Sequence, residues 1–347
     1  MGDAMISVII PAYNAGKFIE NCINSIFSQT YGDFEIIVVN DGSSDNTLDI
    51  LNSLAKKDAR LKVISQENGG VSAARNTALK HAKGEFITYV DADDTLPETA
   101  LADMTELLTD DVDLVVCSNN EIRLKSKPNY MQENVFDGPQ DIYNRFRDFD
   151  RAVWWPWAKL FRRSIISENH LTYDTSITFG EDHIFNLLYS KYITGKAVVS
   201  RKITYNYYFI RGGLTAKFYP DMDEMQKYVY TKIADYFGGA DKIPKKYEHL
   251  YIGSYYKGLV EYYIAWLSRE KAAKQIQNTT ENTFADILTD DILAEYLTPL
   301  QFDCIKSRQY TEFVKDYTKH NPKATVYRKM RRIVRKALEG LQKVFVK

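Results

Sequence analysis

The sequence predicts an α/β fold with a mostly parallel central sheet, followed by a helical C-terminal appendage. Three observations support this prediction. Short apolar runs alternate with helical patterns through the N-terminal part of the chain. These runs are apolar at nearly every position and rich in Val and Ile, which is typical of strands covered on both faces. From about residue 216 the pattern changes to long helical stretches rich in tyrosine.

The expected strands are residues 6–11, 34–40, 61–65, 85–90 and 113–118. Helices are expected between them, within residues 16–30, 43–57 and 71–84, because apolar side chains recur there every three to four positions. Ser44 is a candidate N-cap and Gly84 a candidate C-terminal stop. Thr95 with Glu98 resembles a capping box that opens a helix around residues 97–108. Alternating strands and helices imply right-handed crossovers.

Size and composition narrow the function classes. The 347 residues suit one large or two moderate domains, and the net charge of −1 argues against a protein that binds polyanions over its whole surface. The three cysteines, Cys22, Cys117 and Cys304, are far apart, which argues against a disulfide framework or zinc cage and favours a reducing compartment. We expect no secretory signal and no membrane span, because no apolar run is long enough.

Polar residues follow four of the expected strands. They are "PAYN" (11–14), "NDGSSD" (40–45), "QENGG" (66–70) and "DADD" (91–94). In a parallel sheet these strand ends share one edge, where ligands bind. Each motif alone is also an ordinary turn sequence, but four on one edge favour a ligand site.

The chemistry of this edge favours a metal-bound diphosphate. Neither a dinucleotide fingerprint nor a P-loop motif follows any of the strands. Clustered carboxylates suit a hard cation such as Mg²⁺ or Mn²⁺, which bridges substrate phosphates. The alternative is that Asp93 and Asp94 only begin a helix, where negative charge is favourable, and we expect this simpler role for Asp94.

Four motifs together carry a family resemblance. "SVIIPAYN", "IIVVNDGSSDNT", "NGGVSAARN" and "GEFITYVDADD", in this order, resemble family 2 glycosyltransferases of the GT-A fold, which has a Rossmann-like sheet. The resemblance covers about residues 5–215. It implies inverting transfer of a sugar from a nucleotide diphosphate, usually a UDP-sugar.

The resemblance also implies roles for single residues. The implied nucleotide-binding set is Pro11, Ala12, Tyr13, Asn14, Asp41, Arg75, Asp91, Ala92 and Asp93. Asp41 would accept a hydrogen bond from the base, Asp91 would contact the ribose, and Asp93 would bind the Mn²⁺ or Mg²⁺ ion. These roles make chemical sense, since a carboxylate accepts well from an imide N–H and a metal stabilises the leaving diphosphate.

The same resemblance places the catalytic base in a Glu-Asp pair. Here "TFGEDHIFNLLYS" supplies Glu181 and Asp182 at the start of an expected helix. Asp182 is the candidate base that takes the proton of the acceptor hydroxyl. The simpler interpretation is a favourable helix N-terminus. His183 is expected to be structural or to contact substrate, and not to bind metal.

Two further segments resemble acceptor and diphosphate regions of the family. In "WWPWAKLFRRS", tryptophans are expected partly in the core and partly at the site, where indole rings can stack on sugars, with Trp154 and Trp157 as candidates. In "YNYYFIRGGLTAKF", Arg211 and Thr215 are candidates for binding phosphate oxygens.

The C-terminal third divides into a helical region, residues 216–322, and a basic amphipathic segment, residues 323–347. The domain expected before them spans residues 1–215. A basic amphipathic helix is typical of binding to anionic membranes, although packing on its own domain or on a protein partner would give the same pattern. No nucleic-acid motif accompanies it, so we expect no nucleic-acid partner.

The sequence therefore predicts a metal-dependent, inverting enzyme. Its donor would be a UDP-sugar, and its acceptor a glycan or a lipid-linked glycan in bacterial surface polysaccharide synthesis. It would be cytoplasmic and peripheral on the inner face of the cell membrane. The alternative is a non-catalytic scaffold that binds sugar nucleotides, against which the intact Asp93 and Asp182 argue.

Overall fold

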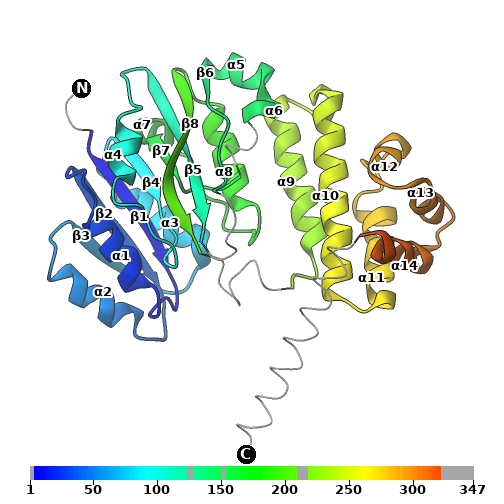
Figure 1. The fold of residues 1–347 in the computed structure, drawn as a ribbon, viewed down its shortest axis with the longest axis horizontal. Helices are drawn as coiled ribbons and strands as arrows, with labels where there is room; N and C mark the ends of the chain where they lie inside the picture. The colour runs from blue at the N-terminus through cyan, green and yellow to red at the C-terminus, as the bar shows by residue number, and fades with distance from the viewer. Residues whose placement is uncertain (1–3, 123–127, 150–153, 209–217, 322–347) are drawn as a thin grey trace, which may run out of the picture. The chain divides into compact units, whose positions relative to one another are not determined.

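The computed structural model describes residues 4–122, 128–149, 154–208 and 218–321 (Figure 1). The chain forms two compact units, Met1–Lys217 and Phe218–Lys347. All candidate site residues lie in the first unit.

The first unit is built on an eight-stranded sheet of order β3-β2-β1-β4-β7-β5-β8-β6. Strands β1, β2, β3 and β4 are mutually parallel, β7 is antiparallel to β4 and β5, β8 is parallel to β5, and β6 is antiparallel to β8. The mostly parallel sheet is therefore confirmed. The strands are β1 (Ile6–Ala12), β2 (Phe34–Asp41), β3 (Leu61–Gln66), β4 (Phe86–Tyr89), β5 (Val112–Glu121), β6 (Asn134–Asp137), β7 (Lys159–Arg162) and β8 (Lys196–Tyr207).

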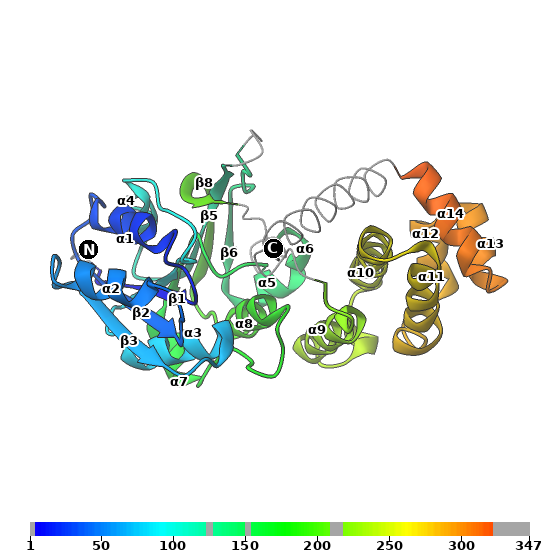
Figure 2. The same cartoon turned by 90° about the horizontal axis from the view of Figure 1, so that it is seen from below.

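Helices cover both faces of this sheet (Figure 2). Alternate residues of the inner strands enter opposite cores: Ile36 and Val38 pack on one face, Ile37 and Val39 on the other. One face holds α1 (Ile19–Phe27), α2 (Thr47–Ala55) and α4 (Ala100–Thr105); the other holds α3 (Gly70–His81), α5 (Gly138–Asn144), α6 (Phe146–Phe149), α7 (Arg163–Glu168) and α8 (Glu181–Ser190). Burial on both faces explains why the strands are apolar at successive positions.

The predicted helix ends at Ser44 and Gly84 are wrong. Helix α2 begins at Thr47, and the Ser44 backbone N–H instead donates to Asn14 Oδ1 at 2.8 Å. Helix α3 ends at His81, before Gly84. Gly84 lies against β1, where an added Cβ would come within 2.5 Å of the Ser7 nitrogen. Both residues serve contacts between distant segments, which a local cap pattern does not report.

The predicted capping box at Thr95 and Glu98 is also wrong. Thr95 instead forms an antiparallel bridge with Asn206 at the end of β8, in which the Asn206 N–H donates to the Thr95 carbonyl at 2.9 Å. Helix α4 begins only at Ala100, and no side chain caps it. Pairing with a distant strand has replaced the local cap.

The described part of the second unit is helical. It contains α9 (Met222–Phe237), η3 (Ala240–Lys242), α10 (Lys245–Trp266), α11 (Arg269–Asn278), the π-helical turn η4 (Thr279–Thr283), α12 (Asp290–Tyr296), α13 (Pro299–Lys306) and α14 (Tyr310–His320). Many of its tyrosines are buried, including Tyr256 and Tyr263, so they serve mainly as packing residues. None of the described helices combines the length and hydrophobicity that a bilayer-spanning segment needs.

Candidate active site

The loops after β1 and β2 are tied together by Asn14. Its φ of +50° turns the chain, its backbone N–H donates to Ser43 Oγ at 3.0 Å, and its Oδ1 accepts from the Ser44 N–H. The preceding Tyr13 is 56% exposed, whereas Ala12 is buried at the end of β1. This edge of the sheet therefore presents an exposed aromatic ring on a loop fixed by hydrogen bonds.

Asp41, the last residue of β2, organises the loop between β3 and α3. Its Oδ1 accepts from Gln66 Nε2 at 2.7 Å and from the Gly69 N–H at 2.9 Å, and its Oδ2 accepts from the Gly70 N–H at 2.8 Å. Gly70 has a φ of +86°, a conformation that favours glycine. Asp41 itself is buried, and its Oδ2 accepts one hydrogen bond where a carboxylate oxygen can accept two.

Arg75 of α3 joins the predicted carboxylates from distant parts of the chain. Its Nη1 contacts Asp182 Oδ1 at 2.5 Å and Glu181 Oε1 at 3.5 Å, and its Nη2 contacts Asp91 Oδ1 at 3.2 Å. The guanidinium also lies 5.1 Å from the centre of the Tyr173 ring. Burial alone would lower the pKa of Arg75, but these carboxylates raise it above its usual value. The structure thus brings together four predicted residues, three carboxylates and the Arg75 cation that holds them.

The Glu-Asp pair lies at the start of a helix, as predicted. Helix α8 begins at Glu181, directly after Gly180, whose φ is +88°. Burial raises the pKa of Asp182 well above its usual value; Arg75 opposes this shift, and Glu181 and Asp91 add to it. A carboxylate with a raised pKa is a stronger general base. The side chain of Asp182 is 25% exposed, so it can be reached from solvent.

Asp93 is the residue that best fits a metal ion. Burial and the neighbouring Asp91 carboxylate raise the pKa of Asp93 to about 6. Within the described ranges, no hydrogen bond or ion pair from another residue compensates its side chain, in contrast to Asp91. A partly buried carboxylate without a cationic partner favours a bound cation. The described residues form no group of three or more potential metal ligands, and Mg²⁺ commonly binds through one or two carboxylates together with substrate phosphates.

The prediction that Asp94 begins a helix is wrong. Asp94 is 1% exposed, its Oδ2 accepts from the Tyr205 hydroxyl at 2.7 Å, and its Oδ1 accepts from the Tyr208 N–H at 2.7 Å. The same Tyr205 oxygen accepts from the Asp91 N–H at 3.1 Å. Burial and the Asp91 carboxylate raise the pKa of Asp94. Asp94 therefore anchors the aspartate turn to the end of β8.

The tryptophans divide between the core and the site surface. Trp157 is 9% exposed, bridges Tyr89 of β4, and stacks on Tyr205 at a centroid distance of 4.5 Å. Trp154 is 40% exposed and stacks on His183, next to Asp182, at 5.0 Å. Burial lowers the pKa of His183 to about 4, so this ring is neutral at physiological pH. Trp154 is thus the better placed of the two to meet a substrate.

Some predictions lie outside the described residues, and some site residues were not predicted. Arg211, Thr215 and the segment 323–347 lie outside the described residues. Tyr205 and Lys159 were not predicted as site residues, although both lie in this region. The chain has many tyrosines and lysines, and the sequence around Tyr205 and Lys159 does not indicate which distant residues they contact.

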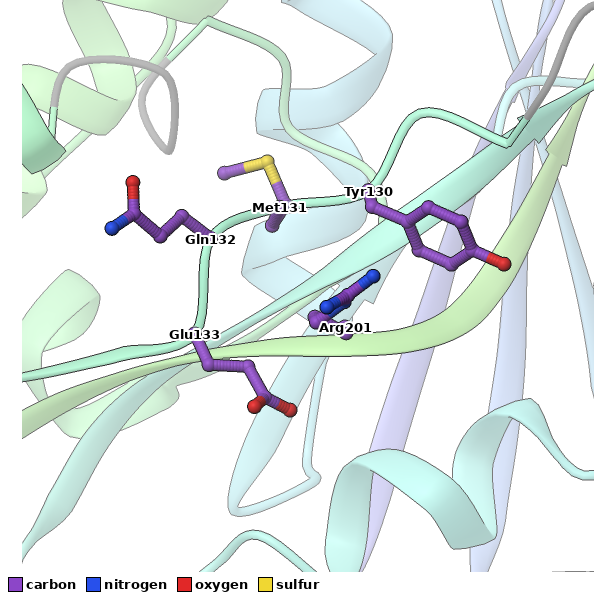
Figure 3. Close-up of a pocket in the computed structure, with 5 residues that line it drawn as sticks. All are labelled: Tyr130, Met131, Gln132, Glu133 and Arg201. Atoms are coloured by element: carbon purple, nitrogen blue, oxygen red, sulfur yellow. The ribbon is translucent and has the colours of Figure 1, made fainter.

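An open hollow of about 460 Å³ lies away from the predicted residues. It is lined by Tyr130, Met131, Gln132, Glu133 and Arg201, from the segment before β6 and from β8 (Figure 3). The Arg201 guanidinium lies 5.0 Å from the centre of the Tyr130 ring. None of the predicted site residues lines this hollow, so it is separate from the Arg75 cluster.

Comparison with known sequences gives the family. The model of glycosyl transferase family 2 matches residues 7–169. Glycosyltransferase GlyG of Streptococcus pneumoniae serotype 4 is 32% identical over 216 residues, which cover 54% of this chain and 67% of GlyG. The uncharacterized glycosyltransferase EpsJ of Bacillus subtilis is 38% identical over 189 residues, covering 53% of this chain and 55% of EpsJ. The chain therefore spans about half the length of EpsJ.

Comparison with solved structures gives the fold. The 1–349 fragment of S. aureus TarS in complex with UDP-GlcNAc matches with a TM-score of 0.65 at 20% sequence identity, covering 91% of each chain. With the mostly parallel sheet and the helical C-terminal region, this match confirms the expected GT-A fold. Family match, relatives and fold agree, and the chain belongs to glycosyltransferase family 2.

Proposed function

We propose that this protein is an inverting glycosyltransferase that moves a sugar from a UDP-sugar to a hydroxyl group of a glycan or lipid-linked acceptor in bacterial surface polysaccharide synthesis. One observation carries the proposal: Arg75 holds the candidate base Asp182 beside Asp91, at the sheet edge that follows β4. Family membership supports the reaction type. The UDP-GlcNAc bound to TarS, which has the same fold, supports the donor class.

Asp182 is the general base of the proposed reaction. Arg75 binds its Oδ1, which orients the carboxylate that takes the proton of the acceptor hydroxyl. The acceptor oxygen then forms a bond to the anomeric carbon as the bond from that carbon to the diphosphate breaks. Attack opposite to the leaving group inverts the anomeric configuration. The raised pKa of Asp182 favours this proton transfer.

Asp93 would hold a Mn²⁺ or Mg²⁺ ion, and Asp91 beside it would contact the ribose of the donor. When bound, such an ion supplies positive charge that stabilises the departing diphosphate. Asp93 is suited to this role because no protein cation neutralises it within the described structure. Its pKa of about 6 leaves it largely ionised at neutral pH.

The nucleoside would bind beside Asp41 and Tyr13. Asp41 Oδ2 keeps one acceptor position for an N–H of the base, and the exposed Tyr13 ring offers a surface for stacking. Asn14 would fix this loop, since it binds both Ser43 and Ser44.

The release of UDP tests the reaction. Purified protein, Mn²⁺ and a panel of UDP-sugars should release UDP, and Asp182→Asn should lower the rate about 10²- to 10⁴-fold, the usual range for a lost general base. Asp93→Ala should also lower it, and EDTA should reproduce that loss. Asp58→Asn, at a surface ion pair with Arg60, is the matched control and should behave as wild type. Tight UDP binding without release from any donor would instead favour a non-catalytic sugar-nucleotide-binding protein.

We also propose that residues 323–347 bind an anionic membrane surface and keep the enzyme at the inner face of the cell membrane. The support is the basic, amphipathic sequence of this segment. Deleting it should abolish sedimentation with anionic liposomes and spare UDP binding. Unchanged sedimentation would refute this role and favour a helix that packs on protein.

A further inference from the structure

Lys159, the first residue of β7, is a fully buried lysine next to the candidate site. Its exposed fraction is 0%, and no carboxylate of the described residues lies within ion-pair distance. Its Nζ instead donates to the backbone carbonyl of Trp155 and, at 3.3 Å, to that of Trp157. It also lies 5.6 Å from the centre of the Trp155 ring. Burying an ammonium without a counter-charge is costly, so these contacts need an explanation beyond packing.

The backbone around Lys159 shows what the ammonium holds. Ala158 has a φ of +56°, unusual for a residue other than glycine, and its carbonyl accepts from the Cys117 N–H of β5 at 2.8 Å. Inward-facing backbone carbonyls need donors, and Lys159 supplies them for Trp155 and Trp157.

A second donor links the Trp155 carbonyl to the helix of the candidate base. Asn186 Nδ2 donates to this carbonyl at 2.9 Å, and Asn186 lies one turn after Asp182 on α8. The Trp155 oxygen is therefore shared between β7 and α8. The ring of Trp154, the residue before Trp155, stacks on His183 of the same helix.

We propose that Lys159 is a positioning residue of the transferase proposed above: its buried ammonium fixes the tryptophan segment, residues 154–157, against α8 and so sets the wall beside Asp182 where the acceptor binds. Lys159 does not touch the reacting atoms in this role. It acts through the carbonyls of Trp155 and Trp157. The inference rests on the proposed function only for its effect on the rate, because the link between the segment and α8 is independent of the reaction.

The charge of Lys159 gives this link a measurable signature. Burial lowers the pKa of Lys159 to about 7, against the opposing effects of Asp182 on α8 and Cys117 on β5. Burial raises the pKa of Cys117 itself to about 12, so that thiol is neutral at physiological pH. The ammonium is therefore present below about pH 7 and lost above it, where its hold on the carbonyls weakens.

Tryptophan fluorescence tests the link without a known acceptor. The chain has four tryptophans, so Trp266→Phe leaves only the three of the segment as reporters. In this background, Lys159→Met removes charge and donors, whereas Lys159→Gln removes the charge but keeps donors. Lys62→Met, at an exposed lysine of β3, is the control.

We expect Lys159→Met to make the emission more quenchable by acrylamide and to lower kcat for UDP release about 10²-fold, the cost of a misplaced site wall. Lys159→Gln should show a smaller increase in quenching and a smaller loss of kcat than Lys159→Met. The affinity for UDP should stay unchanged in both variants. The parent emission should titrate near pH 7, and this transition should vanish in both Lys159 variants but persist in Lys62→Met.

Several results would overturn the proposal. One is unchanged quenching and unchanged kcat in Lys159→Met. Another is an equal change of quenching and kcat in Lys159→Met and Lys159→Gln. A third is a loss of UDP affinity in either variant, which would make Lys159 a general core residue. A parent that releases no UDP but shows the expected quenching and titration differences would refute the proposed function and leave the link to α8 supported.

Discussion

Replacing Arg75 by methionine should destabilise the N-terminal unit strongly. Arg75 is 3% exposed and is the shared cation of Asp91, Glu181 and Asp182. Breaking a buried ion pair by removing one partner costs about 3–5 kcal/mol. The Asp91 and Asp182 side chains are 31% and 25% exposed, so water would compensate part of the loss. We therefore expect the lower end of this range, about 3 kcal/mol.

The loss should depend on pH. Without Arg75, the effects of burial and of like charges that already raise the pKa of Asp182 lose the cation that opposes them. A carboxyl group whose pKa is higher in the folded state than in the unfolded state favours folding at low pH, and this contribution is lost as the pH rises. The Arg75→Met variant should therefore be closest to wild type at about pH 5 and furthest from it at about pH 8.

Urea unfolding followed by tryptophan fluorescence measures this difference. Three of the four tryptophans lie in the N-terminal unit, so Trp266→Phe confines the signal to that unit, which avoids treating the two-unit chain as one transition. Arg60→Met is the control, because Arg60 pairs with Asp58 at 2.7 Å but is 34% exposed. It should cost at most about 1 kcal/mol. Equal losses at the two arginines, or an Arg75→Met loss that does not shrink at low pH, would refute this reasoning.

Three further predictions concern the same edge of the sheet. Asp93 has a pKa of about 6 and must be ionised to bind a cation, so the Mn²⁺-dependent affinity for UDP should fall as the pH drops through about 6. Calorimetry across this range measures that affinity. The Asp93→Asn variant should bind UDP weakly at every pH and show no such fall. Tyr205→Phe should lower the free energy of unfolding by about 1–3 kcal/mol, since it leaves buried hydrogen-bond partners unsatisfied. The control, Tyr130→Phe, changes a 46% exposed side chain and should alter this free energy little. Similar urea midpoints for the two variants would contradict the role of the Tyr205 hydroxyl. Gly70→Ala should cost about 1–2 kcal/mol because its φ is +86°, and Gly32→Ala, in open space at an ordinary φ, is the control that should stay near wild type in the same unfolding assay.

Local sequence patterns were sufficient to predict the strands whose residue types are dictated by burial. The five expected strands all exist. Strands β1, β2, β4 and β5 are buried on both faces and are apolar at successive positions, and the edge strand β3 still places Leu61 in the core. Strands β6 and β7 have four residues each, and β8 carries polar residues, as in "KAVVSRKITYNY", so none showed a clear pattern. Their place in the sheet comes from pairing with distant segments.

The cap predictions failed for a related reason. Ser44, Gly84 and Thr95 are residue types that suit helix ends, but each has a tertiary partner: Asn14, Ser7 and Asn206. A residue's local preference is worth about 1 kcal/mol or less, so a satisfied contact between segments readily overrides it. Asp94 follows the same rule, since its partners lie at the end of β8.

The sequence by itself determined five strands of the sheet, and it predicted a ligand-binding edge and most of the candidate site residues. Through their resemblance to family 2 glycosyltransferases, the four motifs and the Glu-Asp pair predicted Asp41, Arg75, Asp91, Asp93 and Asp182 as site residues. Only the tertiary structure decided how these residues interact. It placed one buried guanidinium among three carboxylates and, within the described residues, left Asp93 without a protein counter-charge. The physical reason is that charge compensation depends on distances of a few ångströms between segments that lie far apart along the chain, and residue order does not encode those distances locally.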